Sequence, residues 1–225
     1  MLKTKKLIII GDGAFAEVAY QYFHYDSEYD VVAFSVEVDF LTRESLFDLP
    51  IIPFEKLEDY FVPSETYFYA ALVFTSFNRL RTRLYLEAKD RGYLVASYIS
   101  KRSYIWPNVK IGEHVFIFED NTIQPFVTIG DNCVIWSGNH VGHHSVIEDN
   151  CFVASHVVIS GSCYIGRNTF LGVNSTIANN VNIGEDNWIG LGATIARDTN
   201  SNLLFKGPRS EASSISALEF FKVEK

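Results

Sequence analysis

From Ile111 to Ile195, every sixth residue of the chain is aliphatic. The column runs without a slip in register, and Ile105 extends it by one step upstream. A fixed short period indicates a repeat architecture, and a six-residue period is typical of a parallel β-helix. We therefore predict a parallel β-helix of hexapeptide repeats from about Ile105 to Ile195.

Each hexapeptide of such a fold supplies a short strand and a turn, and three hexapeptides close one triangular coil. The aliphatic side chain points inward and stacks on the residue eighteen positions later, so each repeat depends on its neighbours. A glycine often follows the aliphatic residue, which we interpret as a sign of a tight corner. These glycines are Gly112, Gly130, Gly142, Gly166, Gly172, Gly184 and Gly190.

The fourth residue after each aliphatic position is usually small, so we expect it to fill the crowded inside of a corner. The three cysteines of the chain, Cys133, Cys151 and Cys163, all occupy this position. We interpret them as core residues rather than as metal ligands or disulfide partners. Asn139 occupies the same position, where it either stacks in an amide ladder or lines a site.

The first hundred residues show a different pattern, in which apolar runs alternate with helical spacing. This alternation predicts a small parallel α/β domain, half the size of a dinucleotide-binding fold. Pro50, Pro53 and Pro63 mark an irregular middle. The expected strands are 7–10, 29–34, 67–73 and 93–97, and the expected helices are 15–24 and 78–91. We expect this domain at residues 1–100, the β-helix at 101–200, and a C-terminal tail or cap at 201–225 in which residues 215–221 shield the open end of the coils.

The segment Gly11-Asp12-Gly13-Ala14-Phe15-Ala16 follows the first expected strand. It resembles the glycine-rich turn whose backbone N–H groups hold a diphosphate at a helix start, with alanine at the third glycine position. The alternative is a strand-to-helix turn without a ligand. Glu37 and Asp39 follow the second strand, where an acidic residue binds a ribose. Because the domain is only half a dinucleotide fold, we expect a nucleotide-linked ligand rather than NAD.

Ser76, Asn78 and Arg79 follow the strand that ends near Leu72. They are either further contacts to a sugar nucleotide at the carboxyl end of a strand or a helix N-cap with surface polarity. Phe15, Phe34 and Phe77 are candidates for stacking on a base.

The formal net charge of −8 argues against a dedicated nucleic-acid-binding protein, which would show a basic face. No apolar run reaches membrane-spanning length. The apolar stretch near the N-terminus covers only Leu7–Ile10, which is too short for a secretory signal. We therefore expect a cytoplasmic location and no membrane insertion.

A family likeness rests on both halves together and on five segments of the second half. These segments are Asn139–Asp149, Ile159–Gly166, Leu171–Ile177, Ile189–Ile195 and Lys206–Arg209. The chain resembles bacterial sugar acyltransferases of the sialic-acid O-acetyltransferase type. These include the N-acetyltransferases that act on nucleotide-linked 4-amino-sugars in bacillosamine, perosamine and viosamine pathways. The resemblance covers nearly the whole chain, and its most specific part is the pairing of this small domain with hexapeptides.

This resemblance implies a left-handed coil and a homotrimer with active sites between subunits. It implies that the small domain binds the nucleotide-linked amino-sugar and that the coils bind acetyl-CoA, with no metal. The positions that match the family for acetyl-CoA are Gly161, Val173, Gly190, Leu191, Lys206 and Arg209. Lys206 and Arg209 would meet the phosphates, with Arg167 and Arg197 as alternatives; the competing interpretation is a solvated basic tail.

The family places its catalytic histidine in a motif that maps onto Gly142–Ile147, so the resemblance implies that His143 is the general base. A histidine titrates near neutral pH, which suits the removal of a proton from an attacking amine. The family commonly has Asp or Glu next, whereas this chain has His144. Glu148, Asp149 or a residue of a partner subunit could supply the carboxylate.

Other readings of the histidine cluster stay open. His140 and His144 either line the site or are structural. The alternative for His143 is a corner histidine that forms hydrogen bonds within its own turn and has no catalytic role. Three histidines can hold a zinc ion, but His140, His143 and His144 lie too close in sequence to match the enzymes that use such a site.

The leading hypothesis for function is an acetyl-CoA-dependent N-acetyltransferase that acts on a nucleotide-linked amino-dideoxysugar for the synthesis of a surface glycan such as lipopolysaccharide. The alternatives are an O-acetyltransferase on a sugar hydroxyl and a non-catalytic β-helix that binds a nucleotide.

Overall fold

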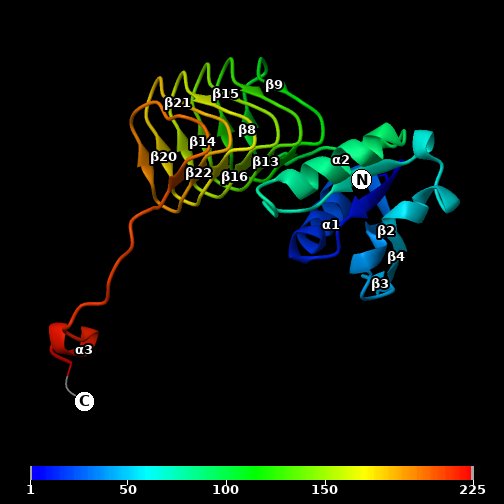
Figure 1. Ribbon diagram of the computed structural model, residues 1–225, viewed down its shortest axis with the longest axis horizontal. Helices are drawn as coiled ribbons and strands as arrows, with labels where there is room; N and C mark the ends of the chain where they lie inside the picture. The colour runs from blue at the N-terminus through cyan, green and yellow to red at the C-terminus, as the bar shows by residue number, and fades with distance from the viewer. Residues whose placement is uncertain (1, 224–225) are drawn as a thin grey trace.

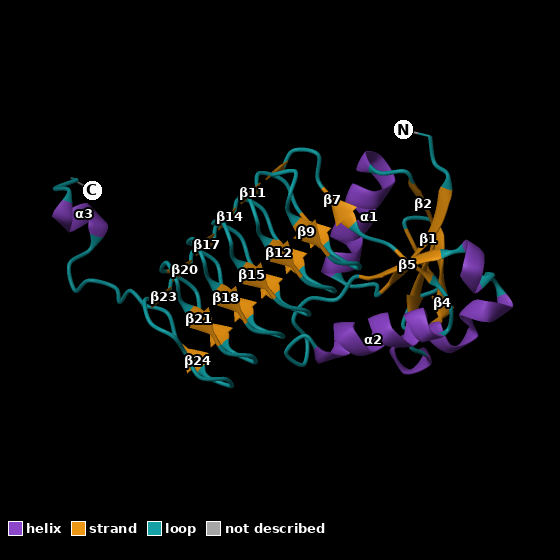
Figure 2. Ribbon diagram, turned by 90° about the horizontal axis from the view of Figure 1, so that it is seen from above, coloured by secondary structure: helices purple, strands orange, loops and turns teal. Residues whose placement is uncertain are grey.

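The computed structural model describes residues 2–223 and consists of an α/β domain, a β-helix and an extended C-terminal tail (Figure 1). The coils of the β-helix stack along one axis, and the α/β domain lies at their N-terminal end, with the N-terminal end of α2 reaching the coils (Figure 2). Within the described residues, no helix is long and apolar enough to cross a membrane.

The α/β domain contains one six-stranded sheet in the order β3-β4-β2-β1-β5-β6. All of its strand pairs are parallel except β3–β4. Helices α1 and α2 cover opposite faces, because α1 packs with Leu7 and Ile9 whereas α2 packs with Ile8 and Ile10. The strands are β1 (Lys5–Ile10), β2 (Tyr29–Val36), β3 (Ser45–Leu46), β4 (Leu49–Pro53), β5 (Tyr67–Ala70) and β6 (Leu94–Val95), and the helices are α1 (Ala14–Asp26) and α2 (Arg79–Asp90). Short 3₁₀ helices lie at Val38–Phe40, Phe54–Asp59 and Pro63–Glu65.

Strands β3 and β4 lie in the segment that the prolines had marked as irregular. Pro50 and Pro53 stand near the two ends of β4 and leave Ile51 and Ile52 between them, both buried. A proline lacks the N–H of a ladder hydrogen bond, but the Ile51 N–H is present and donates to the Glu44 carbonyl oxygen. The expectation of an irregular middle was therefore wrong at this strand.

The β-helix confirms the hexapeptide prediction in register. Its strands are two residues long and form three parallel sheets, in which each residue pairs with the one eighteen positions later, except that β22 pairs with β24 sixteen positions later. The first face contains β7 (Tyr98–Ile99), β10 (Phe116–Ile117), β13 (Val134–Ile135), β16 (Phe152–Val153), β19 (Phe170–Leu171), β22 (Trp188–Ile189) and β24 (Leu204–Phe205). The second face contains β8 (Tyr104–Ile105), β11 (Thr122–Ile123), β14 (His140–Val141), β17 (Val158–Ile159), β20 (Thr176–Ile177) and β23 (Thr194–Ile195). The third face contains β9 (Lys110–Ile111), β12 (Thr128–Ile129), β15 (Val146–Ile147), β18 (Tyr164–Ile165) and β21 (Asn182–Ile183).

The corners of the coils share one backbone conformation. From His114 to Gly192, the third residue after each aliphatic position has a φ between 55° and 75°, the left-handed region. The glycines that follow the aliphatic positions have another cause. A Cβ on Gly166 would lie 2.5 Å from the Glu185 backbone nitrogen of the next coil. These glycines are needed because adjacent coils approach closely, and not, as the tight-corner interpretation held, for the corner angle.

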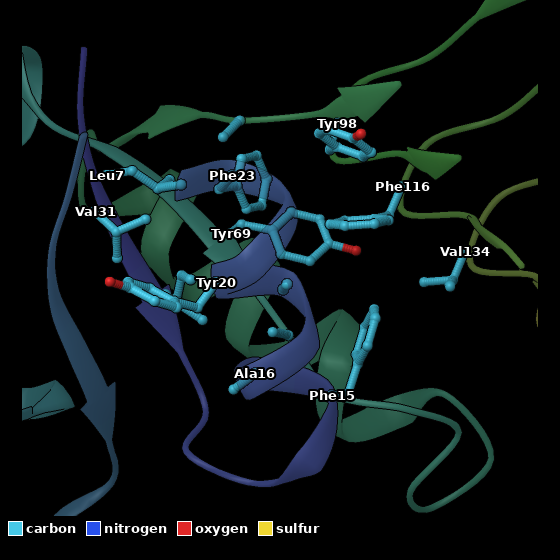
Figure 3. Packing of buried hydrophobic residues seen from close by; sticks show 14 of the residues in the cluster. Leu7, Phe15, Ala16, Tyr20, Phe23, Val31, Tyr69, Tyr98, Phe116 and Val134 are labelled. Atoms are coloured by element: carbon cyan, nitrogen blue, oxygen red, sulfur yellow. The ribbon is translucent and has the colours of Figure 1, made fainter. Parts of the chain in front are cut away.

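The outward side chains of the first face are apolar and carry the α/β domain. Phe116, Phe152, Phe170 and Trp188 stand in a column on this face, and the first of them packs against Phe15 at 5.7 Å between ring centroids. Figure 3 shows how the core of the domain continues from Leu7 and Tyr69 through Phe116 to Val134. The inside of the coils forms a separate core, which contains the three cysteines, all buried and with free thiols.

A buried cation joins the two parts. The Arg81 side chain on α2 is fully buried and donates to the carbonyl oxygens of Val73, Asn132 and Asn150 and to the amide oxygen of Asn132. Two of these carbonyls belong to successive coils. The guanidinium is thereby satisfied by neutral oxygens at the corner between the third and first faces.

His114 occupies the same corner one coil earlier and stacks between the rings of Tyr69 and Tyr85. Its Nε2 accepts a hydrogen bond from the Ala70 N–H at 2.8 Å, so Nδ1 carries the proton and donates to Asn132 Oδ1 at 2.8 Å. Burial lowers the pKa of His114 to about 3. The neutral imidazole thus connects the end of β5 to the β-helix.

The C-terminal tail leaves the last coil and ends in the short helix α3 (Ala217–Phe220), which lies away from the coils in both views (Figures 1 and 2). Its apolar side chains, including Leu218 and Phe220, are exposed. The segment 215–221, expected to shield the open end of the coils, does not cover that end in this structure.

Candidate functional site

A pocket of 340 Å³ opens at the carboxyl ends of β1, β2 and β5. The side chains and backbone of the glycine-rich turn, Gly11 to Phe15, form one wall, and Glu37 lies at the edge. Ligands of parallel α/β sheets bind at this end of the strands, outside the sheet edge. Six of the residues proposed from sequence to bind the nucleotide sugar therefore line one pocket: Gly11, Asp12, Gly13, Ala14, Phe15 and Glu37.

The two glycines of the turn are accommodated for different structural reasons. Gly11 has a φ of +114°, and a Cβ there would lie 3.0 Å from the Ala71 carbonyl oxygen. Gly13 has no atom within 4 Å of an added Cβ, because this position faces open space. Gly13 is also the N-cap of α1, and no side chain of the described residues caps that helix. The first N–H groups of α1 are thus directed to the region of the pocket, where an anion is stabilised.

Both carboxylates of the pocket are paired with arginines. The Nε of Arg43 donates to Asp12 Oδ2 at 3.1 Å, and Arg83 Nη2 donates to Glu37 Oε2 at 2.8 Å. The Glu37 pair raises the pKa of Arg83 above its usual value. Two cations therefore stand beside the pocket, where they offset the acidic residues for an anionic ligand.

The other residues proposed for the nucleotide sugar lie in the loop between β5 and α2 and at the first residue of α2, and this segment packs on the β-helix. Asn78 is fully buried; its Nδ2 donates to the Asn168 carbonyl oxygen, and its backbone, with a φ of 67°, is the N-cap of α2. Arg79 forms an ion pair with Asp186. Ser76 is exposed and is not the N-cap. None of these three is among the residues that line the pocket.

Sequence reasoning missed the apolar wall of the pocket, formed by Val36, Leu80 and Leu84, together with Phe40 and Thr75. The spacing of Leu80 and Leu84, four residues apart on α2, was the available signal. Among the suggested stacking residues only Phe15 lines the pocket. Phe34 is fully buried and Phe77 packs on Trp188. Phe40 is 65% exposed and lies at the pocket.

His143 lies at the corner between the second and third faces and is exposed. Its ring covers Gly161 of the next coil, where an added Cβ would lie 2.7 Å from Cε1 and Nε2. The His143 backbone N–H donates to Gln124 Oε1 at 2.9 Å, and His143 Nδ1 lies 3.1 Å from His144 Nδ1. The imidazole thus packs over Gly161 and contacts His144, the hydrogen bond to Gln124 fixes the His143 backbone, and the side chain stays exposed.

His140 lies on the second face, half-buried, and Asn139 lies inside the corner before it. Asn139 Oδ1 accepts from the Val157 N–H of the next coil, and the Asn139 N–H donates to Asn121 Oδ1 of the previous one. Asn139 therefore forms an amide ladder along the axis. In residues 2–223, no three His, Cys, Asp or Glu side chains are grouped so that they could hold a metal ion.

A second pocket, of 390 Å³, lies at the last coils. Gly190, Leu191, Lys206 and Arg209 line it together with Trp188. These are four of the six positions proposed for acetyl-CoA. Val173 stands one coil before Leu191 and is partly exposed, and Gly161 lies under His143.

The α/β domain and His143 are on different sides of the β-helix. The domain packs on the first face, and the corner that carries His143 lies between the other two faces, opposite the first. Within one chain, the coils therefore stand between the pocket at the strand ends and the imidazole.

The sequence profile described as "Bacterial transferase hexapeptide (six repeats)" matches residues 108–143 and 126–161. No sequence among the curated proteins matches the chain. The hexapeptide repeats are thus identified independently of the periodicity.

Solved structures align with nearly the whole chain. The acetyltransferase domain of PglB from Neisseria gonorrhoeae is 20% identical, with a TM-score of 0.79, over 89% of this chain and 96% of that one. PerB from Caulobacter crescentus, solved in complex with CoA and GDP-perosamine, is 24% identical, with a TM-score of 0.76, over 91% and 95%. WeeI from Acinetobacter baumannii is 19% identical, with a TM-score of 0.67, over 89% and 96%. A perosamine N-acetyltransferase from Caulobacter crescentus was also solved with a histidine replaced by asparagine.

This likeness shows the fold: a small α/β domain followed by a left-handed parallel β-helix. The left-handed coil implied by the family resemblance is confirmed. It departs from the usual right-handed crossover between parallel strands.

Proposed function

We propose that the chain is an acetyl-CoA-dependent N-acetyltransferase that acts on the amino group of a nucleotide-linked amino-dideoxysugar, with His143 as the general base. The observation that carries the proposal is the exposed His143 imidazole, held on Gly161 at a corner of a hexapeptide β-helix. The structures that share both parts of the fold support it, since one is an acetyltransferase domain and another was solved in complex with CoA and GDP-perosamine.

The pocket at the strand ends supports a nucleotide-linked substrate. Its glycine-rich turn and the uncapped start of α1 suit a diphosphate, and its apolar wall suits a base or sugar ring. Arg43 and Arg83 neutralise the carboxylates of Asp12 and Glu37 and so reduce their repulsion of a diphosphate. We propose that the diphosphate lies at Gly11–Phe15 and that Phe40 contacts the base.

The reaction follows from this arrangement. The neutral amine nitrogen of the sugar attacks the thioester carbonyl carbon of acetyl-CoA, a C–N bond forms, and the C–S bond breaks. His143 Nε2 takes the proton that the attacking nitrogen loses, and the leaving thiolate then takes it to give CoA-SH. General base catalysis of this kind contributes about 10²–10⁴-fold to a rate.

We propose further that the active site forms between subunits of a homotrimer. The position of His143 opposite the domain-bearing face supports this arrangement, because the pocket of a neighbouring copy can approach the open corner. The second pocket, with Lys206 and Arg209, would receive the phosphates of acetyl-CoA.

The test is thiol release from acetyl-CoA with a panel of nucleotide-linked amino-sugars and their hydroxyl analogues, for the wild type and His143→Ala. We expect turnover with an amino-sugar and a loss of about 10²–10⁴-fold in kcat for the variant. His156→Ala, an exposed histidine at the corner between the first and second faces, is the matched control and should keep full activity.

Turnover only with a hydroxyl analogue would replace the N-acetyltransferase by an O-acetyltransferase. Binding of nucleotide-sugars without any turnover would support a non-catalytic β-helix instead. Equal rates for the wild type and His143→Ala would remove His143 as the base.

A further inference from the structure

The two adjacent histidines at the open corner form a direct contact. His143 Nδ1 and His144 Nδ1 are 3.1 Å apart, and the ring planes are inclined by 84°. Two imidazole nitrogens at this distance share one proton, because a hydrogen bond needs one N–H and one lone pair. The tautomer of each ring is therefore coupled to that of the other.

The His144 ring is fixed by the coil that precedes it. It stacks on Phe126 with 4.6 Å between ring centroids and 24° between planes. Its backbone has a φ of 60°, and its N–H donates to the Pro125 carbonyl oxygen at 3.1 Å. Stacking and backbone together direct Nδ1 to His143 rather than leaving the side chain free to rotate.

The carboxylates that follow in sequence are engaged at the next corner. Glu148 pairs with Arg167 at 3.6 Å, and Asp149 Oδ1 accepts from the Asp131 N–H at 2.9 Å. Both lie between the third and first faces, whereas His143 lies between the second and third. Within the described chain, the side chain in contact with His143 Nδ1 is that of His144.

We propose that His144 is a positioning residue for the base: its Nδ1 accepts the proton of His143 Nδ1 and so keeps His143 Nε2 free to take a proton from the substrate. This inference rests on the proposed function and adds a residue to it. His144 then carries its own proton on Nε2. The neutral partner orients the base without placing a negative charge beside it.

The proton balance of the pair follows directly. Before the reaction, His143 bears one proton on Nδ1. When Nε2 takes the proton of the amine, the pair gains one positive charge, and the Nδ1–H donates to His144 throughout. The thiolate of CoA removes the proton from Nε2 at the end, which returns both rings to their starting tautomers.

Two substitutions distinguish the contribution of the His144 acceptor nitrogen from the contribution of its stacked ring. His144→Phe keeps a ring that stacks on Phe126 but has no acceptor, and Phe126 itself shows that this corner accepts phenylalanine at positive φ. His144→Asn keeps an acceptor, because Asn Oδ1 is bonded to Cγ as His Nδ1 is, and asparagine recurs at this turn position in Asn174 and Asn180.

We expect His144→Phe to lower kcat by about tenfold or more, as part of what the base contributes, with little change in the KM for acetyl-CoA. His144→Asn should keep most of the wild-type kcat. Equal losses in the two variants, or an unchanged kcat in His144→Phe, would overturn the proposal while leaving His143 as the base.

The tautomer gives a readout that needs no substrate. In protein with ¹⁵N-labelled histidine, long-range ¹H–¹⁵N correlations distinguish a protonated Nδ1 from a protonated Nε2, and the His143→Ala spectrum assigns the signals. We expect Nδ1–H on His143 in the wild type and a shift towards Nε2–H in His144→Phe. A proton on Nε2 of wild-type His143 would contradict the proposal, and this result stands whether or not an amino-sugar is acetylated.

Discussion

Arg81 is a cation with no carboxylate within its hydrogen-bonding contacts, all of which are carbonyl or amide oxygens. Burial lowers the pKa of Arg81, yet a guanidinium stays protonated in proteins. The charge is retained because the corner carbonyls of two coils and the carbonyls of the loop after β5 need donors at one point. Its role is to join the domain to the β-helix.

We expect Arg81→Met to lower the free energy of unfolding by about 2–4 kcal/mol, because buried carbonyls lose their donors. Arg79, two residues before Arg81, forms an exposed ion pair with Asp186. Arg79→Met removes this pair and should lower the free energy of unfolding by about 0–1 kcal/mol. Urea denaturation of both variants measures the difference. Similar values for the two would show that Arg81 does not join the parts.

His114 predicts an acid limit to stability. Its folded pKa of about 3 lies below the usual 6.5, so the unfolded chain binds a proton between these values that the folded chain does not. Stability due to the neutral ring is present above pH 6.5 and is lost as the pH falls towards 3, with a slope of up to about 1.4 kcal/mol per pH unit.

The measurement is denaturation between pH 7 and pH 4. His114→Phe should be less stable at neutral pH but have a shallower decline, whereas His156→Asn, at an exposed corner, should keep the wild-type slope. An unchanged slope in His114→Phe would assign the acid sensitivity to other groups.

At the scale of the element, the spacing between coils limits what the corners tolerate. Gly166→Ala would bring a methyl group to 2.5 Å from the Glu185 nitrogen, so the coils must separate. We expect a loss of about 1–3 kcal/mol in unfolding free energy. Gly13→Ala is the contrasting change, since its Cβ meets nothing within 4 Å, and it should cost less than about 1 kcal/mol.

Thermal and urea unfolding compare the two glycine variants. Gly13→Ala should instead weaken the binding of the nucleotide-sugar, since the added methyl group faces the pocket. A Gly166→Ala protein as stable as the wild type would mean that the coils adjust without cost.

The same scale explains what the sequence predicts. A coil repeats its own pattern, so Ile111 to Ile195 specify both the strands and their register. Helices α1 and α2 followed from their spacing to within a few residues. Strands β3 and β4 were missed because their short ladder depends on a neighbour in the sheet and not on local composition.

The pocket and the anchoring residues were harder to predict than the coils. Gly11 to Phe15 were identified because their backbone motif is local. Arg81 and His114 were not, because their partners lie in segments that only the fold brings close, such as Asn132 and Ala70. The contact between His143 and His144 depends in turn on Phe126 and Gly161, each one coil away.

At the scale of the whole molecule, the proposed trimer predicts complementation between inactive subunits. His143→Ala removes the base, and Gly13→Leu fills the pocket at the strand ends. If each active site takes its histidine from one subunit and its pocket from another, mixed oligomers of the two variants recover part of the activity.

The experiment refolds or co-expresses the two variants with different tags and assays the doubly purified oligomer. Oligomers of each variant alone serve as controls and should stay inactive. Mixed oligomers without activity would mean that the histidine and the pocket of one site belong to a single chain.

Because the coils stack at a constant spacing of about 4.8 Å, each added coil of eighteen residues lengthens the β-helix by the same distance. Under the proposed function, His143 and the pocket around Leu191 and Arg209 are two fixed points along its axis, with Leu191 fewer than three coils beyond His143. Inserting or deleting one whole coil between them would leave the register of every other residue intact. The distance from His143 to the phosphate-binding pocket would then differ from the distance between the thioester and the phosphates of acetyl-CoA. The number of coils therefore sets the length of acyl carrier that the site accepts.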